Sequence, residues 1–146
     1  MERDSRNFRG RVLVPAITYF GIVFATGFVL GAFRVTFVVP RLGVRYAELL
    51  EMPLMLVTTV LAARYVARRF SLPFQTRSRA SIGALAFAFL VGAEIALVYL
   101  LQGLTITSYL SSRDPISGSA YAAMLALFGV MPLLVARRPN PSLERP

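Results

Sequence analysis

IGALAFAFLVGAEIALVYLL, residues 82–101, is a run of twenty residues in which Glu94 is the only charged side chain. An α-helix rises about 1.5 Å per residue, so about 20 apolar residues cross the hydrocarbon core of a bilayer. Three further blocks have comparable length and apolar character: residues 12–39, 49–66 and 119–136. The sequence therefore predicts an all-α protein, an integral membrane bundle of four transmembrane helices within residues 12–138.

Composition and the ends of the chain agree with this class. The chain is 56% hydrophobic with a mean hydropathy of +0.63, which is too apolar for an ordinary soluble domain. The first apolar block is longer than the 7–15 residues of a signal-peptide core, so we expect a retained helix after a basic cytoplasmic segment, residues 1–11. Residues 139–146, PNPSLERP, are expected to form a disordered tail.

The residue inventory excludes several kinds of chemistry. All sixteen basic residues are arginine, and the chain has no His, Cys, Lys or Trp. Disulfides, thiolate nucleophiles, imidazole bases and His-ligated metals are therefore absent. A metal site would need carboxylates alone, and there are seven acids in the chain. We expect no metal and no cofactor.

The arginines predict the orientation in the membrane. Four of them, Arg34, Arg41, Arg45 and Arg113, lie toward one side of the four segments. The other twelve lie toward the opposite side: Arg3, Arg6, Arg9, Arg11, Arg64, Arg68, Arg69, Arg77, Arg79, Arg137, Arg138 and Arg145. The positive-inside rule places that side, and both termini, in the cytoplasm. Because the arginines are scattered beside apolar segments, they favour contact with the lipid bilayer and not with nucleic acid.

Small residues mark two candidate packing faces. Gly27 and Gly31 lie four apart on the first segment, a spacing that lets another helix approach closely. The third segment has a longer series of small residues: Ala84, Ala88, Gly92 and Ala96. At 100° per residue Glu94 lies about 140° from the centre of this series. The third segment thus has two faces that need partners, which favours a homo-oligomer or a complex with another membrane protein.

Arg34, Glu51 and Glu94 form the candidate intramembrane polar site. Helix rise places Arg34 about 13 Å, Glu51 about 10 Å and Glu94 about 4 Å from the bilayer midplane on the outer side. Arg34 and Glu51 therefore match in height, and a bond from Arg34 to Glu94 would be marginal. Arg34 lies on the face of Gly27 and Gly31, so we expect it to be buried against Glu51.

Glu94 itself has two interpretations. An ionisable group in a membrane helix is costly and often functional, which favours a role in carrying protons or a solute. Alternatively, burial keeps the carboxyl protonated, and it bonds to a neighbouring hydroxyl or carbonyl as a neutral link between helices. The sequence leaves both open.

Glu48, Pro53 and Gln102 are supporting candidates near this site. Glu48 precedes Glu51 by one helical turn, and Pro53 within a helix would free the carbonyl of Leu49 to line a polar pocket. The alternative is a helix that begins at Pro53, with both acids in the membrane interface. Gln102 is a polar residue of the same outer half. In the link after it, Asp114 and Ser117 are candidate caps for the fourth segment.

Two stretches carry a resemblance to a known family. They are GFVLGAFRVTFVVPRLGVRYAELLEMPLML, residues 27–56, and YLSSRDPISGSAYAAMLALFGVMPLLVARR, residues 109–138. The chain resembles a family of small, uncharacterised four-helix proteins of the bacterial inner membrane. The resemblance implies the four-helix architecture and that location, and it implies no activity.

Two main classes of function follow. The first is a non-enzymatic packing or accessory protein that docks in the membrane with itself or with another membrane protein. The second is a proton-coupled transporter or small channel that uses Glu94 with Arg34 and Glu51. Residues 85–90 carry no polar group that would continue a path inward, which favours the first class. An enzyme acting on a lipid through the outer acids is a third and weaker candidate.

Overall fold

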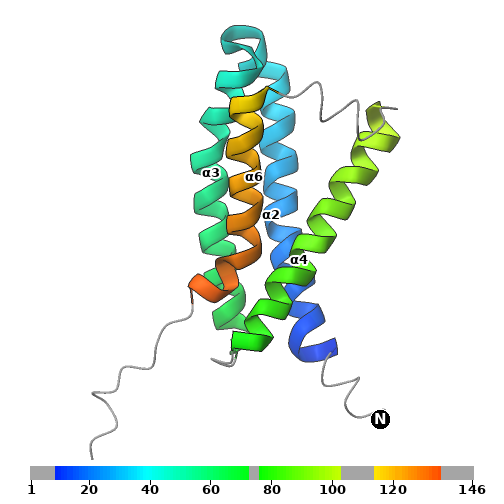
Figure 1. Cartoon of the computed structure of the whole chain (residues 1–146), viewed down its shortest axis with the longest axis vertical. Helices are drawn as coiled ribbons and strands as arrows, with labels where there is room; N and C mark the ends of the chain where they lie inside the picture. The colour runs from blue at the N-terminus through cyan, green and yellow to red at the C-terminus, as the bar shows by residue number, and fades with distance from the viewer. Residues whose placement is uncertain (1–8, 73–75, 103–113, 136–146) are drawn as a thin grey trace, which may run out of the picture.

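The computed structural model describes residues 9–72, 76–102 and 114–135, and every element in these residues is helical. Figure 1 shows their arrangement. The elements are the π-helical turn η1 (Arg9–Leu13), α2 (Val14–Phe33), the π-helical turn η2 (Arg34–Val38), α3 (Val39–Arg69), α4 (Thr76–Leu97), the π-helical turn η3 (Val98–Gln102) and α6 (Pro115–Leu134). The expected tail, residues 139–146, and most of the N-terminal segment lie outside the described residues.

Three helical runs are long and apolar enough to cross a membrane. They are Arg11–Arg69, Thr76–Leu100 and Pro115–Leu134. The first is folded back on itself, since the chain reverses near the beginning of α3 and the rest of α3 lies beside α2 (Figure 1). The all-helical, membrane-compatible prediction is therefore confirmed for the described residues.

Gly43 makes the reversal. Its φ of 77° and ψ of 166° are the one non-helical backbone conformation inside α3. This combination is almost exclusive to glycine because a Cβ would clash with the backbone. Helix continues up to Leu42 and resumes at Val44, so a single non-helical residue separates the helix that includes the first predicted segment, residues 12–39, from the helix that includes the second, residues 49–66. We call this end of the molecule the hairpin end and the opposite end, which holds Arg69 and Thr76, the base.

The core lies in the half of the molecule nearer the base. The helices contribute buried side chains from the beginning of α2 and α4 and from the end of α3 and α6. The most buried of them are Ala16, Tyr19, Val23, Ala62, Ala63, Val66, Ile82, Ala86, Phe128 and Met131. In the other half α4 leans away from α2 and α6 (Figure 1). The helices are thus tightly packed near the base and more open near the hairpin end.

Gly83 on α4 and Gly129 on α6 make a close helix crossing. A Cβ at position 83 would overlap the carbonyl oxygen of Gly129, so only glycine lets the two backbones approach this far. Neither residue belongs to the small series expected to pack.

The predicted small series of α4 faces outward in the single chain. Ala84, Ala88, Gly92 and Ala96 are all exposed. The buried face of α4 is formed instead by Ile82, Gly83, Ala86 and Leu90. At 100° per residue the two faces lie roughly 150° apart. The spacing thus marks a face of small residues, and no helix of this chain covers it among the residues that the structure describes.

Tyr19 and Pro132 form a matched polar contact inside the core. Pro132 lies within α6 and has no N–H, which leaves the carbonyl of Phe128 without its usual helical donor. The fully buried Tyr19 hydroxyl donates to that carbonyl at 2.9 Å, and the Tyr19 and Phe128 rings stack with centroids 4.5 Å apart. Two groups that would each be costly when unpaired therefore satisfy one another.

Tyr19→Phe is expected to lower the free energy of unfolding by about 1 to 2 kcal/mol, because it leaves the Phe128 carbonyl unpaired while the ring stack remains. Unfolding in a detergent titration measures the loss. Tyr19→Phe in a Pro132→Ala background is the control, since alanine restores an N–H for the same carbonyl. A loss as large in that background as in the wild type would contradict the proposed pairing.

Polar contacts of Asp114 connect α6 with α3. At the hairpin end Asp114 caps α6, accepting from the N–H groups of Ile116 and Ser117 at 2.9 and 3.1 Å, as predicted for the capping role of Asp114. Its other oxygen accepts from Nε of Arg45 on α3 at 2.8 Å. The Arg45 hydrogen bond, with the backbone donors, lowers the pKa of Asp114 below its usual range. The contact therefore stabilises the fold at neutral pH and is lost only as pH falls through that lowered pKa.

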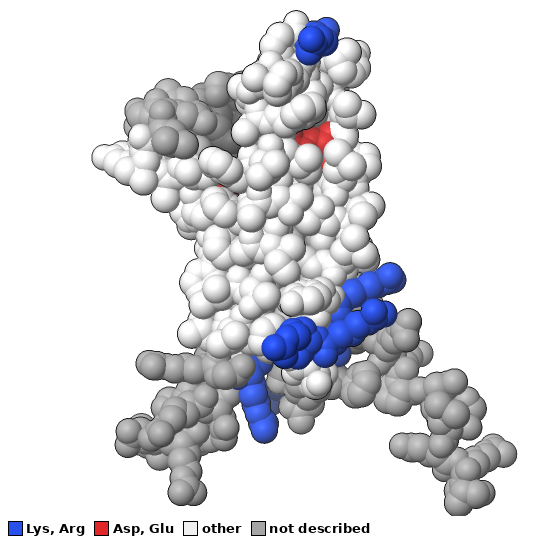
Figure 2. Space-filling view, turned by 180° about the vertical axis from the view of Figure 1, so that it is seen from behind, with Lys and Arg blue, Asp and Glu red and all other residues white. Residues whose placement is uncertain are grey.

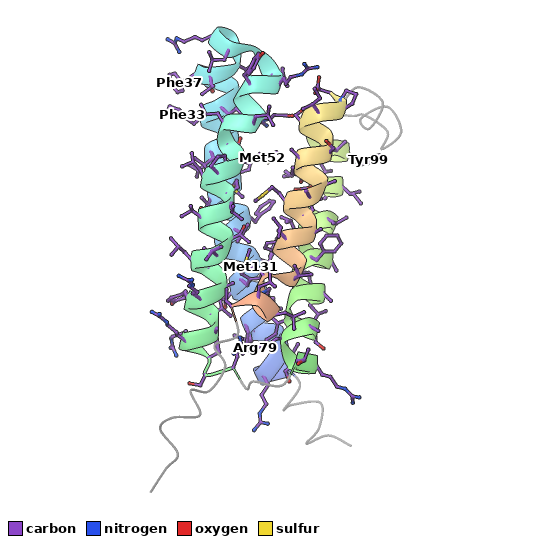
Figure 3. All side chains as sticks on the ribbon, turned by 60° about the vertical axis from the view of Figure 1, so that its left-hand side comes forward. Phe33, Phe37, Met52, Arg79, Tyr99 and Met131 are labelled. Carbon is purple, nitrogen blue, oxygen red and sulfur yellow. The ribbon has the colours of Figure 1, made fainter. Side chains whose placement is uncertain are left out.

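The surface divides into an arginine-rich base and an apolar band. Exposed arginines at the base are Arg11, Arg64, Arg68, Arg69 and Arg77, and Figure 2 shows the cluster on one face. Arg79 is buried there, donating to the Pro132 and Leu72 carbonyls at 3.2 and 3.3 Å. Above the base, large apolar side chains such as Phe33, Phe37 and Tyr99 project outward (Figure 3). This surface suits a membrane.

Candidate functional site

A cavity of about 560 Å³ lies among α2, α3, α4 and α6 in the hairpin half. On α4 it is lined by Leu90, Glu94 and Leu97, the part of the helix that leans away from its neighbours (Figure 1). The cavity therefore occupies the space that opens where α4 leaves the bundle. Val23 and Phe128, which belong to the packed core, form part of its wall toward the base.

The lining is amphipathic. Apolar and soft side chains from all four helices make up most of it: Val23, Phe24, Phe28, Met52, Met55, Leu90, Leu97, Met124, Leu125 and Phe128. The charged lining residues among the described part of the chain are Arg34, Glu48, Glu51 and Glu94. Such a mixture, mostly apolar with a few converging polar groups, is typical of small-molecule sites.

Arg34 bridges two carboxylates of α3. Its Nη1 lies 3.0 Å from Oε1 of Glu48, and its Nε lies 2.9 Å from Oε2 of Glu51. The Nε and Oε2 atoms are buried and are not aligned for a hydrogen bond, so this contact is an ion pair. The pairing of Arg34 with Glu51 follows the heights predicted from the sequence. Glu48, one turn before Glu51, is the second partner because a guanidinium presents a fork of donors.

Arg34 and its two partners lie on neighbouring helical elements, η2 and α3. The π-helical turn η2 begins at Arg34, directly after the α-helical Phe33. Glu48 and Glu51 are three residues apart on α3, so they lie on one face of that helix. The side chains of Arg34, Glu48 and Glu51 are 22%, 11% and 18% exposed, so the cluster is largely shielded. With both acids ionised, its charge is 1 − 2 = −1.

Glu94 is tied to α6. Its Oε1 accepts a hydrogen bond from the hydroxyl of Tyr121, and both residues line the cavity. This is a hydroxyl-to-carboxyl link between helices, the kind of contact anticipated in the packing interpretation of Glu94. Tyr121 was not among the residues predicted from the sequence. A phenol near the start of the fourth segment is the feature that could have identified it.

Glu94→Gln is expected to change the free energy of unfolding little, because the amide oxygen still accepts from Tyr121. Glu94→Leu removes the acceptor and is expected to cost about 0.6 to 2 kcal/mol. Thermal unfolding in mild detergent measures both. Tyr121→Phe in the Glu94→Leu background should add little further loss; a full additional loss there would show that Tyr121 and Glu94 stabilise the fold independently.

Some of the remaining predicted residues line the cavity and others do not. Gly27 and Gly31 both line it; a Cβ at Gly27 would meet Met55 at 3.2 Å, whereas a Cβ at Gly31 would meet nothing within 4 Å. Pro53 is exposed inside α3, so the alternative in which a helix begins at Pro53 is wrong. Gln102 ends η3, and its side chain lies outside the described residues.

Neither a group of metal ligands nor a known relative indicates the function of the site. Within residues 9–72, 76–102 and 114–135, no group of three His, Cys, Asp or Glu residues is placed to hold a metal ion. Comparison with protein-family models, with curated proteins and with solved structures finds no match to this chain. The geometry of the chain itself therefore carries the functional argument.

Proposed function

We propose that this chain is a non-enzymatic accessory protein of the bacterial inner membrane that docks, through α4, with a second copy or with another membrane protein. In this proposal it crosses the bilayer four times with both termini in the cytoplasm. The reversal at Gly43 supports two crossings within Arg11–Arg69, and the arginine-rich base supports the orientation. The bacterial location is part of the proposal and follows from the resemblance of residues 27–56 and 109–138.

The outward face of α4 carries the proposal. Ala84, Ala88, Gly92 and Ala96 are exposed in the single chain, while the opposite face of α4 packs on its neighbours. In a bilayer, small residues at this spacing let a second helix approach closely enough for backbone contact. The crossing of Gly83 with Gly129 uses the same device inside the chain.

Particle mass in mild detergent tests docking. The wild-type protein is expected to purify as a species heavier than its 16.1 kDa chain, measured by native mass spectrometry. Ala88→Leu fills the face and should reduce the species to a single chain. Ala25→Leu, at an exposed alanine of α2, is the matched control and should leave the mass unchanged. A wild type that is already a single chain, or an Ala88→Leu variant of unchanged mass, would count against docking through this face.

A proton-coupled transporter that uses Glu94 is the second candidate. The position of Glu94 on the cavity wall, bonded to Tyr121, favours it. Liposomes containing a pH-sensitive dye distinguish the two functions. Docking predicts that wild-type vesicles acidify no faster than empty ones under a proton gradient. A robust flux that Glu94→Gln abolishes would support transport instead.

A further inference from the structure

We propose that the cavity in the hairpin half binds a lipophilic monocation, an amphiphile with one positive centre and an apolar body. This site is separate from the docking face, since Glu94 and the small series lie on different sides of α4. It neither requires nor follows from the docking function.

The net negative charge of the cavity lining favours a positively charged ligand. Among the described residues three carboxyl groups and one guanidinium line the cavity, which gives 1 − 3 = −2 with all groups ionised and −1 with Glu94 protonated. Arg34 is already held between Glu48 and Glu51 at 3.0 and 2.9 Å. A phosphate or carboxylate ligand would therefore find Arg34, the cation that the described lining residues provide, already neutralised, and it would face the remaining negative charge.

The aromatic and sulfur-containing side chains of the lining also suit a lipophilic cation. Phe24 and Phe28 of α2 line the cavity together with Tyr121, and aromatic faces attract a desolvated cation. Met52, Met55 and Met124 supply flexible thioether side chains that adapt to an irregular apolar body. The polar cluster and this apolar wall share one space of about 560 Å³, within the 300–1,000 Å³ common for small ligands.

Tetraphenylphosphonium and tetraphenylborate are matched probes because they share shape and size and differ in the sign of their charge. Equilibrium dialysis of the purified full-length chain in a neutral detergent is expected to show saturable binding of tetraphenylphosphonium. Tetraphenylborate should bind at least about tenfold more weakly. Glu94→Gln should weaken tetraphenylphosphonium binding several-fold while the protein stays folded.

Two glycine variants locate the site. Gly31→Leu places a side chain in the open space of the cavity and should lower tetraphenylphosphonium affinity by about tenfold or more. Gly92→Leu adds the same side chain on the outer face, where a Cβ also meets nothing within 4 Å, and should bind as the wild type does. Absence of saturable binding, equal binding of the two probes, or a Gly31→Leu variant that binds normally would each overturn the proposal.

Discussion

Arg34→Ala is expected to lower the free energy of unfolding by about 3 to 5 kcal/mol, the largest single loss at the polar site. Without the guanidinium, Glu48 and Glu51 face one another in a shielded environment, where each is at most 18% exposed. Like charges repel strongly at such a place, and neutralising one of them by protonation also costs free energy. Unfolding in a detergent titration measures the loss.

A variant with both Arg34 and Glu51 replaced shows whether the two residues stabilise the fold as a pair or independently. Arg34→Ala combined with Glu51→Ala should be less destabilised than the sum of the two single variants, since it leaves one carboxylate instead of two beside the missing cation. Arg34→Lys should recover only part of the stability, because an ammonium lacks the fork that reaches both Glu48 and Glu51. Strict additivity of the Arg34 and Glu51 losses would mean that the pair contributes nothing.

Gly83→Ala is expected to cost about 3 kcal/mol, a large effect for one methyl group. The added Cβ would overlap the carbonyl oxygen of Gly129, which belongs to backbone and cannot rotate away. Helices α4 and α6 must then separate, which loosens the core around Ile82 and Phe128.

Gly92→Ala is the matched control for Gly83→Ala. It lies on the same helix, and a Cβ there meets nothing within 4 Å, so the variant should be neutral or slightly stabilised by its better helix propensity. Both variants can be compared by thermal unfolding in the same detergent. Equal effects at positions 83 and 92 would contradict the crossing of α4 with α6.

Features that depend on local sequence were predictable. Apolar length identified the helical runs, helix rise placed Arg34 and Glu51 at matching heights, and Asp114 was one of two candidate caps for the fourth segment and caps α6. Each depends on neighbours in the chain or on the fixed geometry of one helix.

Features that depend on which helix lies opposite were not predictable. The series Ala84 to Ala96 has the stronger pattern, yet the lone Gly83 makes the close crossing, because spacing identifies a face without its neighbour. Glu94 required the crossing of α4 and α6 before Tyr121 could be named as its partner. Gly43 was not predicted as the turn, because apolar length alone ends the first segment at residue 39 and begins the second at residue 49, whereas the structure is helical up to Leu42 and again from Val44.

Photo-crosslinking from the outer face of α4 in native membranes tests docking most directly. The chain has no cysteine, so a benzophenone can be attached at one engineered site. Ile95→Cys lies beside the small series, and Leu61→Cys lies on an exposed position of α3 as the control. Docking predicts a discrete protein adduct from Ile95→Cys, its loss when Ala88→Leu is added, and lipid adducts alone from Leu61→Cys. Lipid adducts alone from both positions would contradict it.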